Sequence, residues 1–147
     1  MLKQLATITL FFISLSMIAQ DRENTSIYLE NEFVKVEEFE GQCTSDPLPD
    51  YEAIYFKVTN KTNKQLKLSW EHQVYRNGVC NTCTREYFYT LELKPNEIVE
   101  GGCGSTYNRK LKIFNDYIAE YMKNPKQVVT KFEWANFKTE CLNCNKE

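Results

Sequence analysis

The sequence predicts an all-β protein, an antiparallel β-sandwich of about seven strands with immunoglobulin-like architecture. Most of the chain after residue 20 alternates apolar and polar side chains with a period of two, which is typical of strands with one buried face. Turn-forming residues separate these segments at the spacing of short strands. Only one segment, near 110–122, fits a helix as well as a strand. We therefore expect a single sandwich domain over residues 20–147.

The first three expected strands occupy residues 31–39, 51–60 and 65–76. Prolines at positions 47 and 49 separate the first two, and the polar run 60–64 separates the second from the third. The second and third strands each place a row of apolar side chains on one face. These rows are Ile54, Phe56 and Val58, and then Leu66, Leu68, Trp70, His72 and Val74.

The remaining strands are expected within residues 85–94, 97–100 and 127–139. The first of them directs alternate side chains inward, and Pro95-Asn96 then turns the chain. The last carries apolar residues on both faces. The inward side chains of 85–94 are Tyr87, Tyr89, Leu91 and Leu93.

Residues 109–122 (RKLKIFNDYIAEYM) fit two periods. Leu111, Ile113 and Tyr117 share one face of a strand, whereas Leu111, Phe114 and Ile118 share one face of an amphipathic helix. We favour the strand because the neighbouring segments are strands, and a short helix is the alternative. In either form the segment is expected to cross the domain once.

The first 19 residues have the features of a secretory signal peptide. Lys3 precedes an apolar run over 5–18, and the small residue Ala19 precedes a polar segment. The run is short for a membrane span, which needs about 20 apolar residues. We therefore expect a secreted or periplasmic protein without a membrane span after cleavage.

The charge balance argues against a nucleic-acid partner. The chain has 18 cations and 20 carboxylates, so losing Lys3 leaves 17 against 20, a formal net charge of −3. A nucleic-acid-binding domain would favour a basic face.

The most informative residues are six cysteines. Export permits disulfides, and an even number suits them. Successive antiparallel elements reverse direction, so with seven crossings all the cysteines would lie at one end of the sandwich. Six cysteines allow 15 pairings, and the sequence does not select one. The residues are Cys43, Cys80, Cys83, Cys103, Cys141 and Cys144.

Two other chemistries would use the same cysteines. Cys80, Cys83, Cys141 and Cys144 have the paired spacing of a four-cysteine zinc site. A redox-active Cys-x-x-Cys usually begins a helix, whereas Cys80 and Cys83 lie between two expected strands. We favour structural disulfides, and we expect no cofactor.

Other candidate residues are few. His72, the only histidine, is in register with apolar neighbours and is expected to be a partly buried structural residue. Tyr75 and Phe88 are out of register with the apolar faces of their strands, so they are candidates for an exposed binding patch, and packing at a sheet edge is the alternative. No nucleophile, phosphate-loop or dinucleotide motif is present in the sequence, so we expect a protein that is not an enzyme.

The chain resembles small exported bacterial β-sandwich proteins of unknown function. The resemblance depends on the signal ending Ile18-Ala19-Gln20 and on the turn from Leu93 to Glu97 (LKPNE). It implies no activity. The sequence therefore predicts an exported binding or structural domain that recognises a protein or a small ligand through its disulfide-tied loops. The alternative is a thiol-redox protein or a four-cysteine metal-binding protein that uses the same residues.

Overall fold

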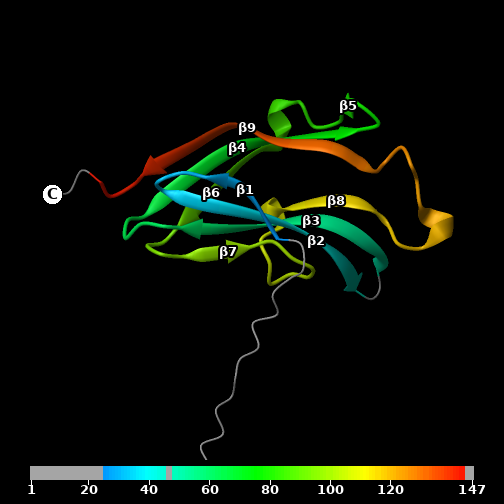
Figure 1. Cartoon of the computed structure of the whole chain (residues 1–147), viewed down its shortest axis with the longest axis horizontal. Coiled ribbons are helices and arrows are strands. Elements are labelled where there is room, and N and C mark those ends of the chain that lie inside the picture. The colour runs from blue at the N-terminus through cyan, green and yellow to red at the C-terminus, as the bar shows by residue number, and fades with distance from the viewer. Residues whose placement is uncertain (1–24, 46–47, 145–147) are drawn as a thin grey trace, which may run out of the picture.

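The computed structural model describes residues 25–45 and 48–144, so the expected signal peptide lies outside the described residues. Two antiparallel sheets stack on one another, as Figure 1 shows. This arrangement confirms the expected all-β, sandwich-like fold. No helix in the described ranges is long and apolar enough to cross a membrane.

Sheet A has β3 at its centre. β2 and then β1 pair on one edge of β3, whereas β7 and β8 pair one after the other along the opposite edge. The strands of sheet A are β1 (Ser26–Glu30), β2 (Val34–Ser45), β3 (Leu48–Asn60), β7 (Ile98–Glu100) and β8 (Lys112–Tyr117).

Sheet B has β4 at its centre. β6 and the short β5 pair on one edge of β4, and β9 runs along the other. The strands of sheet B are β4 (Leu66–Arg76), β5 (Val79–Cys80), β6 (Phe88–Leu93) and β9 (Val129–Cys141).

Three segments differ in detail from the sequence prediction. The strand expected over 31–39 is β2, which begins at Val34 and continues to Ser45, and β1, which the sequence did not predict, precedes it and pairs with it. The strand expected over 85–94 begins at Phe88, since residues Arg85–Tyr87 form the 3₁₀ turn η1. Within 109–122 the strand prediction is confirmed by β8, which lies between the 3₁₀ turns η2 (Arg109–Leu111) and η3 (Glu120–Met122).

The core lies between the two sheets and is rich in aromatic rings. Trp70 of β4 and Trp134 of β9 are stacked with ring centroids 4.5 Å apart. The ring of Phe56, from β3 in the other sheet, lies 4.8 Å from that of Trp134. Alternate residues of β3 and β4 fill the rest of this core, as the period-two pattern predicts.

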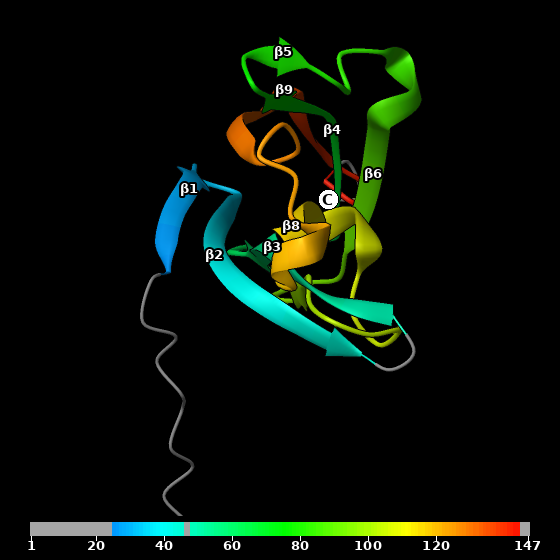
Figure 2. The same ribbon diagram turned by 90° about the vertical axis from the view of Figure 1, so that its right-hand side faces the viewer.

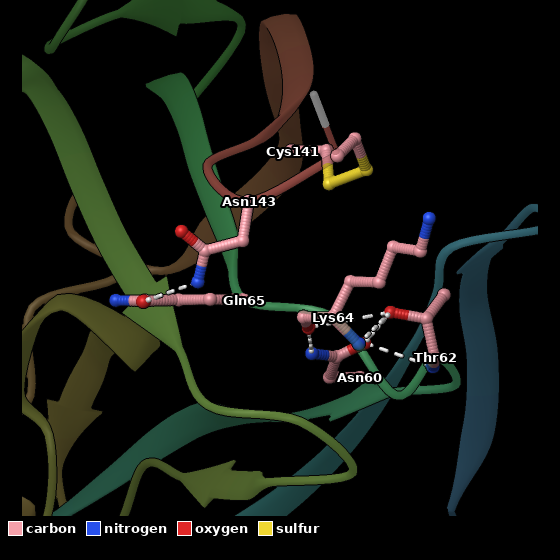
Figure 3. Close-up of a disulfide and its surroundings, with 7 residues drawn as sticks. Asn60, Thr62, Lys64, Gln65, Cys141 and Asn143 are labelled. Carbon is pink, nitrogen blue, oxygen red and sulfur yellow. Dashed lines mark hydrogen bonds between the residues drawn. A yellow bond between two sulfur atoms is a disulfide. The ribbon is translucent and has the colours of Figure 1, made fainter. Parts of the chain in front are cut away.

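The turn from β3 to β4 is held by a buried asparagine (Figure 3). The amide nitrogen of Asn60 donates to the carbonyls of Lys64 and Lys94, each at 2.8 Å. Its amide oxygen accepts from the N–H and the hydroxyl of Thr62. Asn60 is 1% exposed, and these four bonds satisfy its side chain without water.

Candidate functional site

All six cysteines are paired, in one long-range and two local disulfides. Cys43 of β2 is bonded to Cys103, which follows β7, across a sequence separation of 60. Cys80 is bonded to Cys83 and Cys141 to Cys144, each across a separation of 3. No cysteine is free, and both Cys-x-x-Cys pairs are closed as local disulfides.

The prediction that all the cysteines lie at one end of the sandwich is wrong. Cys80 pairs with Tyr75 near the end of β4, whereas Cys141 pairs with Leu66 at its start. The 11 residues of β4 span about 33 Å. In Figure 1, β5 and the arrowhead of β9 accordingly lie at opposite ends of the molecule.

The error has one topological cause. The sequence predicts that the segments of β7 and β8 each reverse the chain direction, but both strands run antiparallel to β3 along the same edge. One reversal is therefore missing, and the last strand delivers Cys141 and Cys144 to the opposite end. The four-cysteine metal site is wrong for the same reason, because its two cysteine pairs are separated by the length of β4. Within the described ranges no group of three or more potential ligands could hold a metal ion.

The Cys80–Cys83 loop completes one edge of β4. Between the segments of β4 that pair with β6 and β5, the hydroxyl of Thr82 accepts from the N–H of Val74 at 2.7 Å. The same hydroxyl donates to the carbonyl of His72 at 2.6 Å. The loop thus supplies hydrogen bonds that a neighbouring strand would otherwise make.

His72 lies beside this loop with its side chain in the core, and at 5% exposed it is more deeply buried than the sequence predicts. Its side chain lies among aromatic rings, and its closest ring neighbour is Tyr89, with centroids 4.8 Å apart. Burial lowers the pKa of His72 to about 4, because the charged imidazolium is poorly solvated there. The residue is therefore neutral at pH 7.

Tyr75 and Phe88 both lie on the outer face of sheet B. Phe88 is 51% exposed, whereas Tyr75 is half-buried and has the ammonium of Lys131 5.1 Å from its ring centroid. Phe88 pairs with Glu71 of β4, so Gln73 lies between the level of Phe88 and that of Tyr75 along the strand. The two aromatic side chains share a face, but they are separated along β4.

A site that the sequence did not indicate lies at the edge of β2. β1 pairs with β2 only as far as Glu38, and β2 continues past it (Figure 2). In the described part of the chain, Glu40, Gly41 and Gln42 pair with β3 alone. A strand edge of this kind presents backbone groups that can pair with another chain.

The direction of these backbone groups follows from the β1–β2 turn. The carbonyl of Val34 accepts from the N–H of Asn31, and its own N–H donates to the Asn31 side chain, so both Val34 groups point toward β1. The pairing of β2 with β3 is regular from Val34 to Cys43. Backbone groups alternate sides along a strand, so the N–H and C=O of Glu40 and Gln42 point outward.

A groove flanks this edge on the outer face of sheet A. The Cys43–Cys103 disulfide holds the loop after β7 over that face, where the groove encloses about 400 Å³. Phe39, Tyr55 and Tyr107 supply aromatic walls. The backbone at Gly102 lies so close to the Tyr107 ring that a Cβ there would be 2.6 Å from it. The groove also reaches Glu40 and Gln42, so it opens onto the strand edge.

Two smaller hollows flank the same edge on the inner face of sheet A. One, of about 280 Å³, lies between Glu38, Glu40 and Ile54 of sheet A and Phe132 of β9. The other, of about 210 Å³, is lined by Glu40, Gln42 and Glu52 together with Asn115. The edge of β2 is therefore bordered by hollows on both faces.

The sequence contains a weak signal for this site. The alternation of 31–39 continues into 40–43, where polar Glu40 and Gln42 lie on one face of the strand and Cys43 on the other. Gly41 has no side chain and interrupts the apolar face, so the expected strand ends before it. Comparison with known proteins adds no further indication, since no family model, curated protein or solved structure matches the chain. The geometry of the site is therefore the basis for assigning a function.

Proposed function

We propose that the protein is an exported, non-enzymatic binding domain that recognises an extended polypeptide by strand addition at Glu40–Gln42. The observation that carries the proposal is the pair of outward-facing backbone units at Glu40 and Gln42, bordered by hollows on both faces. In strand addition, main-chain hydrogen bonds hold the peptide, and pockets for alternate side chains select it.

Export is supported by two independent features. Three disulfides use every cysteine of the chain, and such bonds persist in oxidising compartments. The signal-peptide pattern of the first 19 residues directs the chain to the same destination. The Cys43–Cys103 bond is stable in such a compartment, so it can hold the loop that forms one wall of the groove.

The hollows are necessary for useful affinity. Glu40 and Gln42 together offer two donors and two acceptors, which contribute about 4 kcal/mol at roughly 1 kcal/mol per net hydrogen bond. This energy alone corresponds to a Kd of about 1 mM. Side chains of the added strand must therefore fill the flanking hollows to reach micromolar binding.

The proposal is tested by removing one backbone donor. Gln42→Pro deletes an outward N–H while leaving the hydrogen bonds between β2 and β3 in place, because proline is tolerated where the N–H faces solvent. The probe is a fluorescent heptapeptide of alternating threonine and valine, measured by anisotropy with the disulfide-intact mature protein. We expect Gln42→Pro to weaken binding about tenfold more than Gln42→Ala does, since alanine keeps the N–H.

Two outcomes would contradict the proposal. Equal binding by the proline and alanine variants would show that the backbone of Gln42 is not used. Full binding by a peptide N-methylated on every residue would show that main-chain pairing is not the mode of recognition, because neither edge of such a peptide can donate. Gly41→Pro serves as the folding control, because its N–H points toward β3 and its loss should lower Tm.

A further inference from the structure

The inner side of the β2 edge is acidic. Side chains alternate along a strand, so Glu38, Glu40 and Gln42 share the inner face of sheet A. Glu52 of β3 lies directly opposite Gln42. We refer to Glu38, Glu40 and Glu52 as the acidic strip, and the two inner hollows are lined by these residues.

The acidic strip differs from the outer face of the same strands in its ion pairs. On the outer face, Glu37 is paired with Lys35 at 2.8 Å and with Lys57 at 3.5 Å. Within the described ranges no ion pair involves Glu38, Glu40 or Glu52. Glu38 accepts from the hydroxyl of Ser26 at 3.0 Å, while its second carboxylate oxygen is buried without a hydrogen-bond partner.

Nearby charged groups leave the strip negative. Asp116 lies opposite Glu52, and its buried carboxylate accepts from the backbone N–H groups of Tyr117 and Asn124. Arg76 of β4 interacts with Asp116, and its guanidinium donates to the carbonyls of Phe114 and Asn115. Lys123 interacts with Glu52 only at a distance, because it is bonded to Glu120 at 3.1 Å. Glu120 raises the pKa of Lys123 most, and Glu52 and Asp116 raise it further. The ammonium of Lys123 is therefore paired with Glu120 and not with the acidic strip.

This charge argues against a second copy of the chain as the occupant. Two β2 edges pairing antiparallel about a two-fold axis would bring Glu38 and Glu40 of both copies to one face. Like charges directly opposite one another destabilise a strand pair. Charged side chains on an edge are a common means by which proteins prevent such self-pairing.

We infer that the added strand carries lysine or arginine at alternate positions, an inference that rests on the proposed function. The basic side chains face the acidic strip, and the intervening apolar side chains face the groove beside Tyr55 and Tyr107. Lysine suits the inner hollows because its apolar stem can lie along Ile54 and Phe132 while its ammonium reaches Glu38 or Glu40. The occupant is thus an extended peptide segment of alternating basic and apolar residues.

The experiment compares three heptapeptides that alternate valine with threonine, lysine or glutamate, titrated into the disulfide-intact mature protein at low salt. We expect the lysine peptide to bind about tenfold more tightly than the glutamate peptide, with a difference that falls as salt increases. Glu40→Gln should reduce this ratio severalfold. Glu92→Gln, on the exposed outer face of β6, is the matched control and should leave the ratio unchanged.

The possible results separate the two claims. Equal binding of all three peptides would overturn the charge preference and leave strand addition standing, whereas binding by none of them would overturn strand addition itself. Undiminished binding of a lysine peptide with a central proline would also overturn the inference. Electrostatic attraction to the acidic strip would then be sufficient for binding, without strand pairing. If sedimentation showed a dimer that Gln42→Pro dissociates, a second copy of the chain would be the occupant of the edge. That result would overturn the inference that the occupant is a basic peptide.

Discussion

Two disulfide-bonded regions of this molecule use the same bond for different purposes. The loop after β7 is tied by Cys43–Cys103 across the outer face of sheet A, over a sequence separation of 60. The loop after β5 is closed by Cys80–Cys83 over a separation of 3. The first joins elements that are distant in the chain, whereas the second shapes one turn.

The difference is energetic as well as topological. In the chain-entropy model, a cross-link stabilises by restricting the unfolded chain, so a loop of 60 residues contributes roughly 4 kcal/mol and one of 3 residues roughly 1.6 kcal/mol. The local bond must therefore matter mainly through what its loop does in the folded state. That loop places Thr82 against the edge of β4, above His72.

The largest expected effect is the loss of the long-range disulfide. Replacing both Cys43 and Cys103 by alanine should lower the free energy of unfolding by about 4 kcal/mol, measured by denaturant titration. The matched variant, with alanine at Cys80 and Cys83, should lose less than half as much. Equal losses in the two variants would show that loop length does not determine their stabilisation.

The next largest effect is the acid sensitivity of the core beneath the Cys80–Cys83 loop. Because burial lowers the pKa of His72 to about 4, the unfolded chain binds a proton more readily below the ordinary pKa of 6.5. The stabilisation is fully present above pH 6.5 and is lost as the pH falls toward 4. The loss is on the order of 3 kcal/mol, taken from the pKa difference.

Comparison of the wild type with His72→Phe tests this expectation. The stability of the variant should depend less on pH between 6.5 and 4, so the free energy of unfolding of the variant relative to the wild type should rise by about 3 kcal/mol as the pH falls. Parallel curves for the two proteins would mean that His72 does not titrate across this window and that another group causes the acid sensitivity.

The features that depend on local alternation were predictable from the sequence. The apolar rows of β3 and β4, the inward Leu91 and Leu93 of β6 and the inward position of His72 each follow from side chains two residues apart. These rows face one another in the two sheets, so the sandwich and its core could be inferred from the sequence.

The features that could not be predicted from the sequence depend on pairing between distant segments. Nothing local shows that β7 and β8 share one edge of β3, although this single fact sends Cys141 to the far end of the molecule. In the part of the chain that the structure describes, Glu40 and Gln42 pair with β3 alone, and this likewise depends on where β1 stops pairing. The Cys43–Cys103 bond belongs to one of 15 possible pairings, and only the tertiary fold selects it.

The smallest expected effect isolates what the Cys80–Cys83 loop does in the folded state. Thr82→Val keeps the shape of the side chain and both cysteines, but it removes the hydroxyl that bonds Val74 and His72. Leaving these two backbone groups of β4 unpaired should cost about 1–3 kcal/mol in the free energy of unfolding. Thr82→Ser retains the hydroxyl and should lose much less. If the Thr82→Val protein were as stable as the Thr82→Ser protein, water would be replacing the hydrogen bonds of Thr82. The loop would then stabilise the fold only through its short cross-link.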